Sequence, residues 1–334
     1  MTTLRALVPW DGTNRVYFNR AGFAILDDSG IALEMPELSV FPATEEALIP
    51  ALQGVDVFFA GSEYVTRPIL EQVPSLKLVQ RIGVGYDKVD VKAATELGVL
   101  VAIAPGVLTE TVAEHAMALM MAVAGHVPWY DRQVKAGGWS PVLREDLLGS
   151  TLGVAGLGQI GKEIVKRARA FGMKIAAFDI LQDEAFAREY DVVYADLPEL
   201  LSSADFLILS LVLDDKTRGM IDKQALAAMK PTAHLINVAR GALVDEEAVC
   251  DALAEGSLAG FATDVFTKTP LPSDHRLLQF DNVVVTPHVA AASKRTTLRL
   301  VQRAAECASK LLLGQPAPEG CIVNPEVMPV WRGH

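Results

Sequence analysis

Short apolar runs alternate with helix-like segments along almost the whole of this 334-residue chain. In the first hundred residues, segments such as 45–52 and 91–96 have the 3.6-residue spacing of amphipathic helices. Strand-like apolar runs lie on either side of them, at 5–8, 56–60, 77–82 and 99–103. Strands that alternate with helices are typical of a parallel sheet with crossover helices, so this part predicts one small doubly wound unit.

A second series of the same kind begins near residue 150. Helical patterns at 162–171 and 246–255 separate its strands, which we expect at 151–155, 174–178, 206–211, 234–238, 260–263 and 283–286. A long helical stretch at 108–124 connects the two series. Another follows at 293–313, before a Pro-rich end. A helix that long could return the chain to the first unit, so we expect two α/β domains with a ligand in the cleft between them.

Composition and charge narrow the functional classes. Apolar residues make up 51% of the chain and charged residues 21%, which suits two packed cores and argues against disorder. The net charge of −11 argues against a nucleic-acid surface, because binding phosphates requires clustered Lys and Arg. A small anion can still bind an acidic protein in a local positive pocket.

The cysteines and the chain's apolar segments indicate the cellular setting. Cys250, Cys307 and Cys321 form no CxxC pair and have no metal-ligand spacing, so we expect apolar fillers, no metal site and a reducing cytoplasm. No signal-like start is visible, and no apolar stretch reaches the roughly 18 residues of a membrane span. We therefore expect no membrane partner.

A glycine-rich turn is the strongest local feature of the sequence. Gly156-x-Gly158-x-x-Gly161 follows an apolar strand and precedes a helical pattern. Gly156 would permit the tight turn, Gly158 the approach of a pyrophosphate, and Gly161 close packing of helix on strand. The amides of Gln159 and Ile160 would open the helix, where its dipole favours phosphate. Turn glycines alone match this pattern by chance, so a second signal is needed.

Asp179 supplies that signal. It ends the apolar run 174–178 and lies 18 residues after Gly161, close to the spacing of a carboxylate that accepts the ribose hydroxyls. A carboxylate there would repel a 2′-phosphate, so the pattern predicts an NAD site rather than an NADP site. The competing interpretation is a chance glycine turn followed by a surface Asp.

Two polar residues mark the expected reacting centre, because ligands of open α/β sheets bind beyond the carboxyl ends of the strands. Arg240 follows one such strand and His288 follows another. A guanidinium suits a carboxylate and its neighbouring carbonyl, and an imidazole can donate or remove the proton of an alcohol. Either residue alone is more often structural, Arg240 as a strand-end ion pair and His288 as a cap.

Several motifs together resemble the D-isomer-specific 2-hydroxyacid dehydrogenase family over nearly the full length of the chain. They are RIGVGYD at 81–87, VAEH at 112–115, GLGQIG at 156–161, NVARG at 237–241, DVF at 264–266 and TPH at 286–288. The resemblance implies a Rossmann NAD-binding domain, residues 104–291, inserted into a flavodoxin-like substrate domain, residues 1–103 and 292–334. It also implies a homodimer formed through the cofactor domain, with the helix at 113–124 at the interface.

The resemblance also assigns roles to individual residues. It implies that the backbone of Val84 and Gly85 binds the carboxylate of a small acid substrate, that Arg240 orients this substrate, and that His288 is the acid/base. Asp264 is expected beside the nicotinamide carboxamide. The same cofactor site is expected to include Val238, Ala239 and Ala290, which adjoin the two reacting residues. Trp10, in the first unit, is a candidate for lining an apolar substrate pocket or for packing in the core.

One departure from the family pattern affects the chemistry. The family has a glutamate five positions after the Asp of DVF, where this chain has Thr269. That glutamate holds the imidazole and favours its charged form. With threonine there, we expect the pKa of His288 to fall toward or below the reference value of about 6.5, which leaves less imidazolium for reduction. Thr269 could still donate a hydrogen bond to the ring.

Three interpretations of this departure are open. The chain is an active dehydrogenase with a re-tuned acid/base pair, an NAD-bound enzyme with another net reaction such as a lyase, or a nucleotide-sensing protein without turnover. Because the chain has both Arg240 and His288, the interpretation as a sensing protein without turnover is disfavoured. A second departure, Val289-Ala290-Ala291 where the family has glycines, either narrows the pocket beside the nicotinamide or has no effect.

Overall fold

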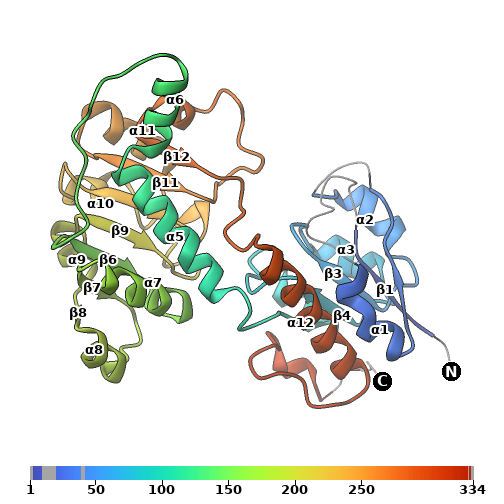
Figure 1. Ribbon diagram of the computed structural model, residues 1–334. Helices are drawn as coiled ribbons and strands as arrows, with labels where there is room; N and C mark the ends of the chain where they lie inside the picture. Colours follow the sequence, from blue (N-terminus) through green and yellow to red (C-terminus); the bar gives the residue numbers. More distant parts are fainter. Residues whose placement is uncertain (1–2, 10–19, 39–41, 330, 332–334) are drawn as a thin grey trace. The chain divides into compact units, whose positions relative to one another are not determined.

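The computed structural model describes residues 3–9, 20–38, 42–329 and 331. The candidate pocket residue Trp10 lies outside this part of the chain. The chain divides into two compact units, Met1–Leu108 with Ala292–His334, and Thr109–Ala291. We call them unit 1 and unit 2, and each is described by itself (Figure 1).

Unit 1 is built on a five-stranded parallel sheet in the order β2-β1-β3-β4-β5. Its strands are β1 Leu4–Leu7, β2 Ile31–Glu34, β3 Val57–Ala60, β4 Leu78–Arg81 and β5 Leu100–Ala102. Strands β3 and β4 are buried along their whole length. Strand β3 is apolar throughout, as expected of a central parallel strand, whereas β4 ends in the buried polar residues Gln80 and Arg81. The order 2-1-3-4-5 is that of flavodoxin-like folds.

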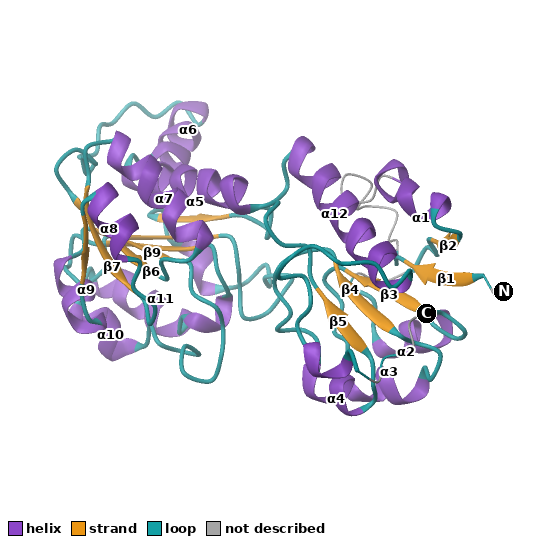
Figure 2. Ribbon diagram, turned by 90° about the horizontal axis from the view of Figure 1, so that it is seen from below, coloured by secondary structure: helices purple, strands orange, loops and turns teal. Residues whose placement is uncertain are grey.

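Helices cover both faces of this sheet (Figure 2). One face carries α1 and α12, with the 3-10 turn η1 leading into α1, and the other face carries α2, α3 and α4. Their bounds are η1 Arg20–Phe23, α1 Ala24–Asp28, α2 Glu45–Ala51, α3 Arg67–Gln72, α4 Val91–Glu96 and α12 Lys294–Leu312. The Ser293 side chain caps α12 by accepting a hydrogen bond from the Thr296 amide. The C-terminal helix thus completes the layer over the first sheet.

Unit 2 is built on a seven-stranded parallel sheet in the order β12-β11-β10-β9-β6-β7-β8. Its strands are β6 Thr151–Ala155, β7 Lys174–Phe178, β8 Val192–Tyr194, β9 Phe206–Leu209, β10 His234–Asn237, β11 Gly260–Thr263 and β12 Val283–Val285. The chain order reverses between β6 and β9, the switch point at which such sheets bind dinucleotides. This arrangement confirms the predicted fold class of two doubly wound parallel-sheet units.

Helices flank the second sheet on both sides as well. Figure 2 shows α5 and α7 over one face and α9, α10 and α11 over the other. The helices of unit 2 are α5 Thr109–Ala124, α6 Val127–Lys135, α7 Gln159–Ala170, α8 Glu184–Tyr190, α9 Leu197–Ser203, α10 Lys223–Ala228 and α11 Glu246–Glu255. No helix in the described part of the chain is both long and apolar enough to cross a membrane.

Candidate active site at the strand ends of unit 2

The glycine turn lies between β6 and α7, as its sequence predicts. Gly156 has a φ of 95°, and a Cβ there would lie 2.8 Å from the Leu211 amide nitrogen. A Cβ at Gly161 would collide with the carbonyl oxygen of Gly156. Both positions therefore need glycine for internal reasons, one for its backbone conformation and one for close packing of the helix.

Gly158 differs from the two glycines that flank it. A Cβ at this position would meet no protein atom within 4 Å, and its φ of −72° suits any residue. It is the N-cap of α7 and, without a side chain, contributes no capping hydrogen bond to the first amides of the helix. A phosphate fits this place, because the helix dipole and the free amides both favour an anion there.

Asp179 stands directly after β7 and faces the same turn. One of its carboxylate oxygens accepts a hydrogen bond of 2.6 Å from the Leu157 amide, and the other accepts one of 3.0 Å from Leu181. The side chain is half-buried, and each carboxylate oxygen retains a lone pair for a ribose hydroxyl. These residues fit a dinucleotide whose adenosine ribose lies beside Asp179.

Adjacent strands bring the candidate reacting residues to one edge of the sheet. Strand β10 pairs with β11 and β11 with β12, with Asn237 opposite Thr263 and Thr263 opposite Val285. Arg240, Asp264 and His288 each follow one of these parallel strands within a few residues, so all three lie at the same carboxyl edge.

The turn that carries Arg240 is held by its own neighbours. The Asn237 side chain donates to the Arg240 carbonyl at 2.8 Å and accepts from the Ala239 amide at 3.0 Å. A Cβ at Gly241 would collide with the backbone of Phe266, so this turn packs directly on the segment that follows β11. Val238 and Ala239 are both 8% exposed, and Arg240 is partly exposed.

Asp264 organises the turn that carries His288. The Asp264 side chain is 1% exposed, and its two oxygens accept hydrogen bonds of 2.8 Å from the Val289 and Ala290 amides. Its backbone carbonyl accepts from the His288 amide at 2.9 Å. Three consecutive amides are thereby fixed by one residue.

The ionisation of Asp264 follows from these contacts. Burial by itself would raise the pKa of this carboxyl. The hydrogen bonds that it accepts from neighbouring side chains and from the two amides outweigh burial, so the pKa of Asp264 lies below its ordinary value. Asp264 is thus a fixed negative charge at the strand ends.

His288 occupies an unusual backbone conformation. Its φ of 56° lies in the left-handed region, which costs a non-glycine residue of order 1 kcal/mol or more. The two hydrogen bonds of its amide, to Asp264 and at 3.1 Å to the Thr286 carbonyl, hold the turn in this conformation. The residue is exposed rather than packed in the core, which disfavours a structural cap.

His115 joins this network and was not predicted to do so. Its ring Nε2 lies 3.0 Å from the Thr286 hydroxyl and 3.5 Å from an Asp264 oxygen. The Thr286 hydroxyl donates to Asp264 at 2.6 Å, so its oxygen can only accept from His115. The geometry therefore assigns the proton of His115 to Nε2 and makes a directed chain from His115 through Thr286 to Asp264.

Thr269 is exposed in the segment after β11 and, among the described residues, its side chain makes no hydrogen bond to His288. The start of that segment is held elsewhere, since the Thr267 amide donates to Glu246 at 2.6 Å. Glu246 also lies 3.4 Å from the ring of His275. The carboxylate that this segment engages, Glu246, therefore contacts Thr267 and His275.

The predicted substrate-binding loop lies in unit 1, after β4. Val84 and Gly85 are partly exposed, and the Gly85 carbonyl accepts a hydrogen bond of 3.0 Å from Arg81 Nε. Arg81 is 8% exposed and lies near Glu63, which is 1% exposed. Burial raises the pKa of the Glu63 carboxyl, although the charges of Arg81 and Lys88 oppose that shift. The loop is thus held by the buried guanidinium of Arg81.

No group of His, Cys, Asp and Glu within the described ranges has the arrangement of a metal site. The three cysteines are free and buried.

Comparison with known proteins gives one family. Residues 117–290, more than half of the chain, match the family model of the D-isomer specific 2-hydroxyacid dehydrogenase, NAD binding domain. A glyoxylate reductase from Korarchaeum cryptofilum is 39% identical over 296 residues, which cover 86% of this chain and 89% of that enzyme.

Solved structures show the same similarity. The TT0316 protein from Thermus thermophilus has a TM-score of 0.85 and 32% identity, and the match covers 96% of this chain and 100% of that one. An NAD-dependent formate dehydrogenase from Staphylococcus aureus, solved in complex with NAD, also has a TM-score of 0.85, with 26% identity over 96% of this chain and 99% of that one.

Proposed function

Because this chain belongs to the D-isomer specific 2-hydroxyacid dehydrogenase family, we propose that it reduces a small 2-oxo acid of the glyoxylate type to its D-2-hydroxy acid, reversibly. The chain is an NAD-dependent oxidoreductase of this family. Unit 2 would bind the cofactor, and unit 1, with Val84 and Gly85 in its β4 loop, would bind the substrate carboxylate.

The cofactor assignment rests on the fit of unit 2 to a dinucleotide. The open space at Gly158 and the amides of Gln159 and Ile160 suit the pyrophosphate, and the carboxylate of Asp179 suits the ribose. Asp264 Oδ2 accepts one amide and keeps room for one more donor, such as a carboxamide. Val238, Ala239 and Ala290 lie at the same strand ends and would line the nicotinamide side.

The reaction follows from the charges at those strand ends. The cofactor, when bound to unit 2 as NADH, would supply the hydride for the carbonyl carbon. His288, as imidazolium, donates its proton to the carbonyl oxygen, and as neutral imidazole removes that proton in the reverse direction. Arg240 provides a planar pair of donors that holds the substrate carboxylate and polarises the carbonyl. In the net reaction, a 2-oxo acid, NADH and one proton are converted to a 2-hydroxy acid and NAD.

The observation that carries the proposal is the turn held by Asp264. The buried Asp264 carboxylate anchors this turn, and the left-handed backbone at His288 leaves the imidazole exposed. His288 follows β12, Asp264 follows the neighbouring strand β11, and Arg240 follows β10, the next strand in the sheet. Strained backbone of this kind persists only where its surroundings enforce it, and it clusters at reacting centres.

The test of the proposal is a substrate screen with the purified chain. NADH oxidation is followed with glyoxylate, hydroxypyruvate, pyruvate and bulkier 2-oxo acids, and the product is resolved by chiral chromatography. We expect turnover with the smaller acids and, for chiral products, the D isomer. NADH binding without turnover of any 2-oxo acid would refute the assignment.

The comparisons give no support to the two alternatives, a different net reaction or a sensing protein without turnover. The replacement of the family's glutamate by Thr269 concerns the efficiency of proton transfer rather than the reaction class.

We also propose that the chain is a cytoplasmic homodimer formed through unit 2. The segment after α5 exposes large apolar side chains, with Trp139 87% and Leu143 95% exposed, together with Val127, Val134 and Leu148. Apolar surface of this kind is typical of a protein interface, and a second copy of unit 2 would cover it. The three free, buried thiols suit a reducing compartment.

A further inference from the structure

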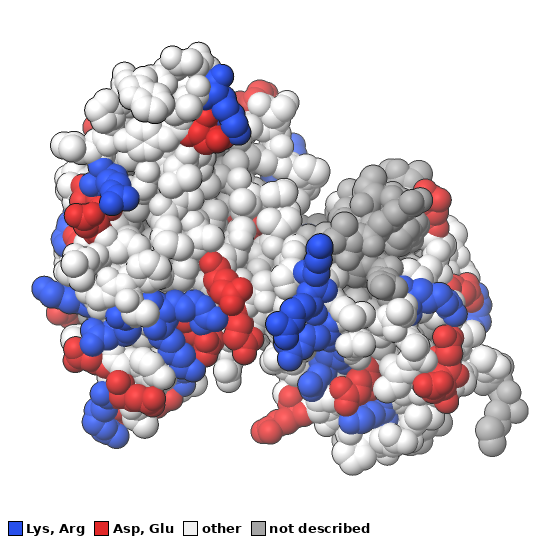
Figure 3. All heavy atoms as spheres, viewed as in Figure 1, with Lys and Arg blue, Asp and Glu red and all other residues white. Residues whose placement is uncertain are grey.

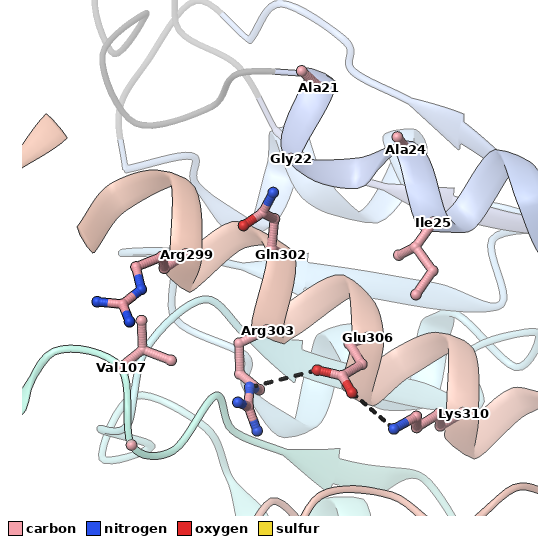
Figure 4. A pocket seen from close by; sticks show the side chains of 11 residues that line it. Ala21, Gly22, Ala24, Ile25, Val107, Arg299, Gln302, Arg303, Glu306 and Lys310 are labelled. Carbon is pink, nitrogen blue, oxygen red and sulfur yellow. Dashed lines mark hydrogen bonds and ion pairs between the residues drawn. The ribbon is translucent and has the colours of Figure 1, made fainter. Parts of the chain in front are cut away.

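A hollow of about 510 Å³ lies in unit 1, and its lining includes no residue proposed above for cofactor, substrate or proton transfer. One wall is the face of α12 from Arg299 to Lys310 (Figure 4). The other walls are the η1–α1 segment and the two residues Gly106 and Val107. Its volume is in the range of sites for small molecules.

The α12 wall is charged. Arg299, Arg303, Glu306 and Lys310 follow one another at intervals of three or four residues, so they lie on one face of the helix. The opposite face, which includes Leu300 and Ala304, is buried. The charged face lines the hollow and is also open to solvent, since Arg299 is exposed and Arg303, Glu306 and Lys310 are partly exposed.

The charges in this wall do not balance. Glu306 pairs with Lys310 at 2.7 Å and more loosely with Arg303 at 3.6 Å. Arg299 makes no hydrogen bond or ion pair with any described residue. Three cations face one carboxylate, in a protein whose net charge is −11. Figure 3 shows the Lys and Arg side chains gathered over α12.

The facing wall is apolar. Ala21, Ala24 and Ile25 come from the η1–α1 segment, and Val107 lies close to Arg299 in Figure 4. Ile25 is 37% exposed although it is a large apolar side chain. A ligand that fills this hollow would therefore meet guanidinium groups on one side and aliphatic carbon on the other.

We propose that this hollow is a binding site for a small organic anion. Its phosphate or carboxylate group engages Arg299 and Arg303, whose planar donors match either oxyanion. Its apolar part lies against Ile25 and Val107. Lys310 contributes less, because Glu306 already neutralises it. The site is separate from the proposed reaction and does not depend on it.

The experiment is a calorimetric titration of the full chain with saturating NADH, so that the cofactor site is occupied. The probes are phenyl phosphate, benzoate, inorganic phosphate and neutral benzyl alcohol. Phenyl phosphate and benzoate separate phosphate from carboxylate recognition. The apolar wall predicts tighter binding of phenyl phosphate than of inorganic phosphate, and the cations predict no binding of benzyl alcohol.

Variants locate the binding on α12. The double variant Arg299→Gln/Arg303→Gln should lose about tenfold or more in affinity for the better organic anion, since it loses charge-assisted hydrogen bonds. Arg295→Gln removes a cation from the same helix but not from the hollow, and should match the wild type. Glu306→Gln frees Arg303 and Lys310, and should bind more tightly.

Affinity unchanged in the double variant, or an equal loss in Arg295→Gln, would overturn the proposal. Weaker binding of the anion by Glu306→Gln would also overturn the proposal. This second variant keeps the test decisive if the double variant folds poorly. When no anion is added, Arg299→Gln is expected to turn over the 2-oxo acid as fast as the wild type. Failure of the anion site can therefore be distinguished from failure of the proposed reaction.

Discussion

Asp264 makes several different contacts at the proposed reacting centre. Its carbonyl holds the His288 amide, its carboxylate holds the next two amides, and its charge stays fixed because its pKa is lowered. The turn is therefore fixed by contacts within the protein. These contacts fix the backbone of the turn, whereas a carboxylate at position 269 would act on the imidazole ring and favour its charged form.

That distinction gives a prediction at Thr269. Thr269→Glu should raise 2-oxo acid reduction near pH 7.5 by about fivefold, because a nearby carboxylate raises a histidine pKa by roughly one unit or more. The measurement is kcat/KM for reduction against pH. Thr269→Gln, of similar size and without charge, is the control and should stay near the wild type. A folded Thr269→Glu protein with neither a higher rate nor a shifted high-pH limb would contradict this account.

A second prediction concerns His115 as a positioning residue. His115→Leu removes the donor to Thr286 and should lower kcat by about tenfold, the value of one lost hydrogen bond, with little change in NADH affinity. His115→Gln keeps a donor and should recover most of the rate. If both variants lose thermal stability and turnover to the same extent, the role of His115 is only structural.

The sequence predicts some residues of this site and not others, for a physical reason. Arg240, Asp264 and His288 each follow a parallel strand, and the carboxyl ends of such strands meet at one edge, so their proximity follows from local patterns. His115 reaches Thr286 only because α5 packs across β10, β11 and β12, since the two residues are 171 positions apart in the chain. A tertiary contact of that range leaves no mark in the apolar periodicity of α5.

At the scale of elements, the predictions succeed where an element is buried. Strands β6, β7 and β11 have the predicted bounds, as do helices α4 and α11. Strands β2 and β8 were not predicted. Both lie at sheet edges and are only three or four residues long, and the partly exposed side chains of an edge strand give no continuous apolar run.

The β6–α7 turn allows folding and cofactor binding to be separated. Gly158→Ala adds a methyl group where no protein atom lies within 4 Å, so its thermal unfolding should match the wild type while NADH affinity falls by about tenfold or more. Gly161→Ala places a methyl group against the Gly156 carbonyl and should cost about 1–3 kcal/mol of stability. Calorimetry and fluorescence titration of NADH measure the two effects. The reverse pattern would show that the turn does not face a phosphate.

At the scale of the whole molecule, His234 makes stability depend on pH. It is 2% exposed on β10, stacks on Phe206 at 5.2 Å between ring centroids, and its Nδ1 has no hydrogen-bond partner. Burial, with a smaller contribution from the charge of His126, lowers the pKa of His234 from 6.5 to about 4. The folded state therefore holds this ring neutral.

The sign of the effect follows from linkage. Because the folded pKa is lowered, the stabilisation is fully present above pH 6.5 and is lost as the pH falls through 4, since the unfolded chain takes up the proton first. Urea unfolding at pH 7 and pH 4 should show that the wild type loses about 3 kcal/mol more than His234→Phe, which has no proton to take up. Equal losses in the two proteins would mean that His234 is not held neutral.

The central claim is that His288 transfers the proton and does not merely support the cofactor site. The most direct test is His288→Ala, with NADH affinity measured by fluorescence titration and 2-oxo acid reduction measured by NADH oxidation. The account predicts that kcat falls by about a hundredfold or more while the NADH dissociation constant changes little. A parallel loss of NADH affinity and turnover, or turnover close to that of the wild type, would contradict it.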